Sequence, residues 1–222
     1  MEHHGIQIRP YEPRDREAVR AISLSTAYGG GGEGIIEATL FLDLMVRAYT
    51  DFAAGSVWVA EQAGVESAER VVGYLAGAFD ERRFHRIQAW RVVPEAVARS
   101  LGRGLLWRGE LWRLLGDLPA FLADGRKGDS PDEEGYPGHL HVNLSPESRG
   151  RAVGARLMES FLAEARRRRL PGVRGVVYET NGPARRFFER QGFKPLGRRP
   201  AFKPPPADGG REWKIVYGKD LR

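Results

Sequence analysis

Short runs of apolar residues in the first third of the chain predict strands. These runs are residues 6–9, 56–61 and 70–79. The polar turn between the last two favours an antiparallel hairpin. Apolar residues at helical spacing predict two helices, one that starts near Pro13 and one over 35–49. The run 28–34 between them has five glycines in seven residues, which costs too much backbone entropy for a helix and predicts a loop.

From residue 139 onward, strand and helix patterns alternate. Strands are predicted at 139–144 and 173–178, helices at about 150–168 and 183–190, and short strands at 193–196 and 212–218. A strand–helix–strand unit implies a right-handed crossover between parallel strands. Because the upstream hairpin is antiparallel, the sequence predicts an α/β fold with a central, twisted, mixed sheet flanked by helices.

Residues 80–135 interrupt this order and are rich in Arg, Trp and Leu. One or two helices are predicted between about 95 and 122, with breaks near Gly102, Gly104 and Pro119. The stretch is long for a connection and should have a role of its own. We therefore expect a single domain, 1–222, with a helical insertion at about 80–135.

The composition, 41% hydrophobic and 29% charged over 222 residues, is typical of a soluble globular protein. No apolar run approaches the roughly 18 residues of a membrane span, and the N-terminus lacks the apolar core of a signal peptide. We therefore expect a cytoplasmic protein with no membrane partner. The absence of cysteine excludes disulfides and a cysteine nucleophile. A net charge of +6 attracts nucleic acid, anionic lipid or a phosphorylated small molecule without choosing among them.

The strongest local feature is the segment SPESRGRAVGARLMESF, where a strand ends and an amphipathic helix begins. Free backbone N–H groups at such a helix start form an anion site, which the helix dipole strengthens. Arg149 and Arg151 add positive charge, and the small residues let a phosphate approach the backbone. A helix start that has small residues by chance is the simpler alternative.

The hexapeptide RGRAVG fits the pattern Arg/Gln-x-x-Gly-x-Gly/Ala, with Ala152 in place of the first glycine. The segment ETNGPARRFFERQGF follows the next predicted strand. Together, and in this order of strands and helices, the two motifs resemble the GNAT superfamily of acetyl-CoA-dependent N-acyltransferases. The resemblance covers most of the chain except 80–135. It implies the GNAT fold, with acetyl-CoA as co-substrate.

The resemblance also implies where coenzyme A would bind. The loop 149–155 would wrap the pyrophosphate. The pantetheine arm would lie where strand 139–144 parts from strand 173–178, bonded to the backbone like an added strand. The residues so implied are Val142, Asn143, Leu144, Arg149, Gly150, Arg151, Ala152, Val153, Gly154, Ala155, Asn181, Ala184 and Phe188. We expect Ala152 to hold an ordinary helical backbone and so to hinder phosphate approach only slightly.

Acetyl transfer to an amine needs a base, because an amine with a pKa of about 10.4 is mostly protonated at pH 7. His139 and His141 are two apart on a predicted strand and therefore point to the same face. This His-Leu-His sequence resembles the pair in serotonin N-acetyltransferase that relays a proton through water, although it lies one residue nearer the loop. Purely structural histidines are the alternative. A metal site would need a third ligand that the sequence does not offer, so we expect no metal.

Phe188 stands where many GNAT members have a tyrosine that protonates the departing thiolate. Tyr178, on the preceding strand, is the candidate replacement. Alternatively the thiolate leaves unassisted, since a thiol with a pKa of about 8.5 is a fair leaving group near neutral pH.

We therefore expect an N-acetyltransferase that moves an acetyl group from acetyl-CoA to a primary amine by direct attack in a ternary complex. The catalytic candidates are His139, His141 and Tyr178. The alternative is a non-catalytic regulatory module that binds acyl-CoA on the same fold. Nucleic-acid binding is a weaker third option. The sequence leaves open the acceptor amine and the oligomeric state, a homodimer included.

Overall fold

The computed structural model describes residues 5–27, 38–64, 70–102, 135–201 and 212–222. This part of the chain forms one seven-stranded sheet in the order β1-β2-β3-β4-β5-β7-β6. The strands are β1 (Ile6–Pro10), β2 (Val57–Gln62), β3 (Val71–Ala78), β4 (Gly138–Leu144), β5 (Gly172–Tyr178), β6 (Lys194–Pro200) and β7 (Trp213–Asp220). Neighbouring strands β4 and β5 run parallel, and the other pairs are antiparallel. The predicted mixed sheet and the β2–β3 hairpin are confirmed.

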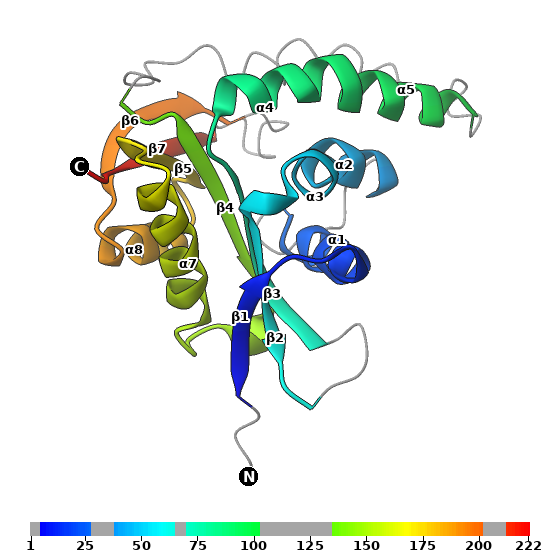
Figure 1. Cartoon of the computed structure of the whole chain (residues 1–222). Helices are drawn as coiled ribbons and strands as arrows, with labels where there is room; N and C mark the ends of the chain where they lie inside the picture. The colour runs from blue at the N-terminus through cyan, green and yellow to red at the C-terminus, as the bar shows by residue number, and fades with distance from the viewer. Residues whose placement is uncertain (1–4, 28–37, 65–69, 103–134, 202–211) are drawn as a thin grey trace.

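Helices cover both faces of the sheet (Figure 1). One face carries α7 (Val153–Arg167) and α8 (Gly182–Arg190). The other carries α1 (Arg16–Thr26), α2 (Ala38–Met45), α3 (Arg47–Phe52), α4 (Glu81–Ile87) and α5 (Val93–Gly102). Short turns of 3-10 helix lie at η1 (Pro13–Asp15), η3 (Ala54–Ser56) and η7 (Pro146–Ser148). Each face therefore has its own apolar core, one under α1 to α4 and one under α7 and α8. Among the described residues, no helix is long and apolar enough to cross a membrane.

Two helix predictions need correction. The described part of the predicted helix 35–49 is divided, because α2 ends at Met45 and α3 begins at Arg47, with Val46 between them at φ −111°. The insertion becomes helical at Glu81, well before residue 95. The Asp80 side chain caps this start by accepting a hydrogen bond from the Arg83 N–H at 2.9 Å.

The early start of α4 was missed because its sequence, ERRFHRI, is mostly polar and offers few apolar positions from which a helical period can be recognised. A π-helical stretch, η5 (Gln88–Val92), joins α4 to α5 and keeps Phe84, Gln88 and Val92 on the buried side. These three buried positions are four residues apart, so one side of the helical stretch packs on the core. The predicted breaks at Gly104 and Pro119, and the predicted loop 28–34, lie outside the described residues.

Candidate functional site

The two parallel strands of the sheet part halfway along their length. Residues 138, 139 and 140 of β4 pair with 173, 174 and 175 of β5, and the pairing extends no further between these two strands. The Ser145 N–H donates to the Val72 carbonyl at 2.9 Å. The N–H and C=O groups of the odd-numbered residues in this half of β4 therefore point toward β3. Backbone groups alternate along a strand, so those of Val142 and Leu144 face the opening. The expected parting of the strands is present.

The start of α7 lies beside this opening and leaves its backbone donors open. The first N–H groups of a helix have no intrahelical acceptor, and no side chain caps those of α7 among the described residues. The first helical bond is from the Arg156 N–H to the Ala152 carbonyl, at 3.1 Å. Val153, Gly154 and Ala155 therefore offer N–H groups at the positive end of a fifteen-residue helix. Exposed Arg149 and Arg151 precede them.

The loop before α7 corrects one expectation about Ala152. Its φ is +57°, in the left-handed region, and that of Gly150 is +78°. Alanine in this region is strained by roughly 1–2 kcal/mol relative to a right-handed conformation. The position therefore needs a glycine-like backbone, and alanine holds it at a cost.

Close packing brings α7 and α8 to the edge of the opening. A Cβ added at Gly154 would come within 3.3 Å of both Leu144 of β4 and Phe187 of α8. Phe188 is buried, and its ring lies against Gly175, the last β5 residue that pairs with β4. Phe188 therefore lies at the base of the opening, among apolar neighbours. Half-buried Ala184 lies on the same helix.

Asn181 has a local structural role. Its side-chain oxygen caps α8 by accepting a hydrogen bond from the Ala184 N–H at 3.1 Å. The start of α8 thus has the side-chain acceptor that α7 lacks.

On the opposite face of the sheet, His139 lies in a buried polar cluster. Its side chain is nearly buried, at 8% exposure, and its Nε2 lies 2.7 Å from the Tyr49 hydroxyl. Its Nδ1 faces Glu81 Oε1 at 3.6 Å. Glu81 also accepts a hydrogen bond from His85 Nε2 at 3.2 Å and forms an ion pair with Arg174.

Burial sets the protonation states in this cluster. Desolvation lowers the pKa of His139 to about 3, so the imidazole is neutral at pH 7. Desolvation opposes ionisation of Glu81, but the hydrogen bond from His85 and the ion pair with Arg174 lower its pKa to about 2. The cluster therefore combines a neutral His139 with a Glu81 carboxylate.

His141 differs from His139 because its side chain reaches solvent. Its ring meets the Tyr49 ring edge-on, with centroids 5.8 Å apart. The surrounding protein lowers the pKa of His141 by desolvation, and the positive charges of Lys214 and Arg199 lower it further. At pH 7 His141 therefore offers an unprotonated imidazole that water or a substrate can reach.

Two candidates remain, Tyr178 and Asn143. Tyr178 lies on the face of the sheet that carries His141, and the Asn143 side chain is held by hydrogen bonds. The strand register places Tyr178 on the same face as His141, and the Lys214 ammonium lies 5.3 Å from the Tyr178 ring. The Asn143 side chain donates to the Tyr74 hydroxyl at 2.8 Å and accepts from Thr26 at 3.2 Å. Asn143 is thus fixed in a polar network next to His141.

Sequence reasoning missed Tyr49, Glu81 and Arg174. A glutamate four residues before a histidine, directly after the capping Asp80, was an available signal for Glu81. An arginine within an otherwise apolar strand was a signal that Arg174 has a buried acidic partner. Tyr49 gave no such signal, because it fits an ordinary buried helix position.

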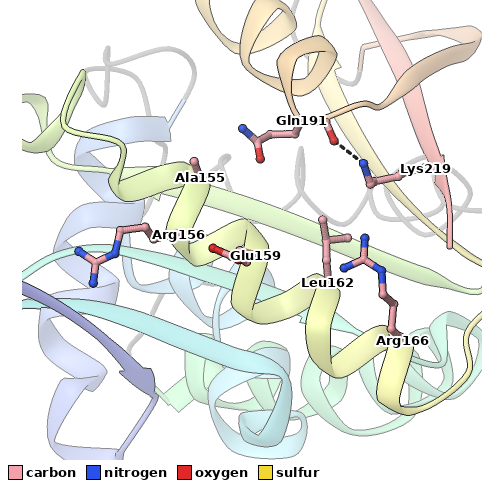
Figure 2. A pocket seen from close by; sticks show the side chains of 7 residues that line it. All are labelled: Ala155, Arg156, Glu159, Leu162, Arg166, Gln191 and Lys219. Atoms are coloured by element: carbon pink, nitrogen blue, oxygen red, sulfur yellow. Dashed lines mark hydrogen bonds between the residues drawn. The ribbon is translucent and has the colours of Figure 1, made fainter.

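A separate hollow of about 340 Å³ lies between α7, the end of α8 and β7 (Figure 2). It touches the predicted phosphate loop only at Ala155 and extends to the end of α8 and to β7. The other lining residues are Arg156, Glu159, Leu162, Arg166, Gln191 and Lys219. Both histidines lie across the sheet from α7, so this hollow is separate from the proton chemistry.

Comparisons with known proteins agree with this geometry. Residues 120–195 match the family model of the acetyltransferase (GNAT) domain. The chain is similar to the crystal structure of SsHAT, at 26% identity and a TM-score of 0.75, over 98% of this chain and 99% of that one. It is also similar to YncA of Salmonella typhimurium, a putative acetyltransferase solved with its cofactor acetyl-CoA, at 16% identity and a TM-score of 0.57, over 98% and 95% of the chains. The ribosomal-protein-S18-alanine N-acetyltransferase of Escherichia coli matches at 14% identity and a TM-score of 0.54, over 98% and 94%.

The parted strands, the open helix start and these matches define the class of protein: it has the fold of the acyl-CoA N-acyltransferases. Residues 120–195 match the acetyltransferase (GNAT) domain, and the chain as a whole has the same fold as the solved acetyltransferases to which it is similar.

Proposed function

We propose that this protein transfers the acetyl group of acetyl-CoA to a primary amine by direct attack in a ternary complex, and that residues 1–222 act as one domain. The observation that carries the proposal is the opening between β4 and β5 with an uncapped α7 start beside it. The donors at this opening fit the chemistry of coenzyme A. Open N–H groups and two arginines suit a pyrophosphate, and an unpaired strand edge suits the amides of a pantetheine arm.

The binding role is assigned to specific parts of the chain. Residues 149–155 would hold the pyrophosphate, and the backbone of Val142 and Leu144 would bond the pantetheine. Phe188, Ala184 and the capped turn at Asn181 would border the arm. Acetyl-CoA supplies an activated thioester carbonyl, and the backbone N–H near Leu144 would polarise that carbonyl and stabilise its oxyanion.

The two histidines take different parts in catalysis. His141 is the general base, acting directly or through a water, because its imidazole is neutral and open to solvent. His139 is unsuited to this role, because its two nitrogens face Tyr49 and Glu81. When the amine attacks, a C–N bond forms, the C–S bond breaks, and the amine proton passes to His141. Tyr178 protonates the thiolate, or the thiolate leaves without help.

The first experiment is calorimetric titration of acetyl-CoA into the protein at two salt concentrations, with desulfo-CoA and ATP as controls. Micromolar binding that survives moderate salt is expected, because the opening recognises more than phosphate charge. Binding that disappears with salt, or that ATP reproduces, would contradict the site.

Turnover is then tested with a panel of primary amines and with the double variant His139→Ala/His141→Ala. The double variant should lose turnover and keep its acetyl-CoA affinity. An unchanged pH–rate profile in that variant would exclude the histidines from catalysis.

A further inference from the structure

The Tyr49 side chain packs against both histidines of β4. It is buried, comes from α3, and places its hydroxyl 2.7 Å from His139 Nε2. Its ring lies edge-on to His139 and to His141, with centroids 5.7 Å and 5.8 Å away. Tyr49 therefore contacts both the buried histidine and the one that reaches solvent, and the two imidazole rings also meet each other edge-on, with centroids 5.8 Å apart.

The charges around His139 determine the direction of the hydrogen bond to Tyr49. An ionised carboxylate only accepts hydrogen bonds, so a lone pair on His139 Nδ1 would be repelled by Glu81. Nδ1 must then carry the proton of the neutral ring, and Nε2 must accept. The Tyr49 hydroxyl, whose pKa burial raises well above its ordinary value, is the donor. Arg174 holds the Glu81 carboxylate in place from β5.

We propose that Tyr49 is a positioning residue for His141. Glu81 fixes the tautomer of His139, His139 fixes the phenol of Tyr49, and the Tyr49 ring holds the imidazole of His141 in the orientation that receives the amine proton. The inference rests on the proposed role of His141 as base. Other charged groups that act on His141 are Lys214 of β7, Arg199 of β6 and Glu81 of α4.

The test variant is Tyr49→Phe, which removes the hydroxyl and keeps the ring. Without its bond to His139, the ring loses its fixed position, and kcat should fall about tenfold or more, since small misplacements of a catalytic group are costly. The KM for acetyl-CoA should not change. A freer His141 should regain hydration, so the acid limb of the pH–kcat profile should move to higher pH. Tyr11→Phe is the matched control, a tyrosine of the same core that makes none of the ring contacts above.

A loss of thermal stability in Tyr49→Phe, with kcat and the pH profile equal to those of Tyr11→Phe, would overturn the proposal. A second measurement does not depend on the variant's folding. Imidazole nitrogen shifts in the wild-type protein should show His139 as the Nδ1–H tautomer between pH 6 and 8, and the Nε2–H tautomer would contradict the argument.

The inference and the proposed function fail differently. If His141→Ala retains full turnover, the base assignment fails, and Tyr49 loses its role with it. If His141→Ala is inactive while Tyr49→Phe is unaffected, only the positioning role fails.

Discussion

The two faces of strand β4 differ in chemistry although they belong to the same seven residues. Leu140, Val142 and Leu144 lie on the side of α7 and α8, in an apolar core. His139 and His141 lie on the opposite side, where Tyr49 contacts both rings. The apolar side adjoins the open helix start, and the polar side holds the titratable groups.

This difference separates cofactor binding from proton transfer. The unpaired edge of β4 borders both faces of the sheet. A thioester bound in the opening would therefore be within reach of groups on the face that carries the histidines. Changes on the α7 side should therefore alter acetyl-CoA affinity, and changes on the histidine side should alter turnover. The following predictions test that separation.

The largest effect is expected from His141→Ala. Removing the base should lower kcat about 10²–10⁴-fold, the usual contribution of general base catalysis. The acetyl-CoA dissociation constant should stay the same, because the side chain lies on the other face. Steady-state kinetics and calorimetry on one protein preparation measure both. A loss of acetyl-CoA affinity equal to the loss in kcat would show that the faces are not separate.

Acid should lower the free energy of unfolding of the protein through the buried groups on the histidine face. His139 has a pKa of about 3 when folded and about 6.5 when unfolded, so the unfolded chain binds the extra proton between these values. The free energy of unfolding should fall as pH drops below about 6.5, by up to about 1.4 kcal/mol per pH unit from this group. Glu81 adds a loss below its ordinary pKa of about 4.3, since its folded value is about 2.

Chemical denaturation at a series of pH values measures this dependence. A His139→Asn variant should show a smaller fall between pH 6.5 and 4.5. Equal curves for the variant and the wild type would mean that His139 is not held neutral by burial.

On the α7 face, Gly154→Val should weaken acetyl-CoA binding about tenfold, which corresponds to about 1.4 kcal/mol. The valine side chain has no room beside Leu144 and Phe187, so it must displace one of them or cover the open N–H groups. Turnover at saturating acetyl-CoA should change less than affinity. Ala163→Val, on the exposed side of the same helix, is the control. Equal affinities of the two variants would place the cofactor elsewhere.

The smallest effect is expected from Ala152→Gly. Glycine relieves the left-handed strain of roughly 1–2 kcal/mol but gives the unfolded chain more freedom, which costs about 0.5–1 kcal/mol. The net gain in unfolding free energy should lie between about 0 and 1.5 kcal/mol. Ala163→Gly, in right-handed helix, should instead lose about 1 kcal/mol. Equal losses in both variants would show that Ala152 is not strained.

Local sequence patterns sufficed for the strands and for the start of α7. The alternation in β1, the crossover from β4 to β5 and the small residues of 149–155 each depend on neighbouring positions, so the pattern alone indicates them. The segment of α4, ERRFHRI, offers few apolar positions from which such a pattern can be recognised, and α4 was missed for that reason.

The polar cluster could not be predicted, because its contacts join distant segments. Tyr49 and His139 are 90 positions apart in the chain, and their bond depends on how α3 packs on the sheet. The strain at Ala152 was also hidden, since nothing in the identity of an alanine reveals a positive φ.

Amide chemical-shift mapping during titration with acetyl-CoA tests the central claim most directly. The account predicts the largest shifts at Val142 and Leu144, on the β4 edge of the opening, and at Gly150 and Gly154, around the start of α7. Shifts confined to the hollow of Figure 2, at residues such as Gln191 and Lys219, would contradict it.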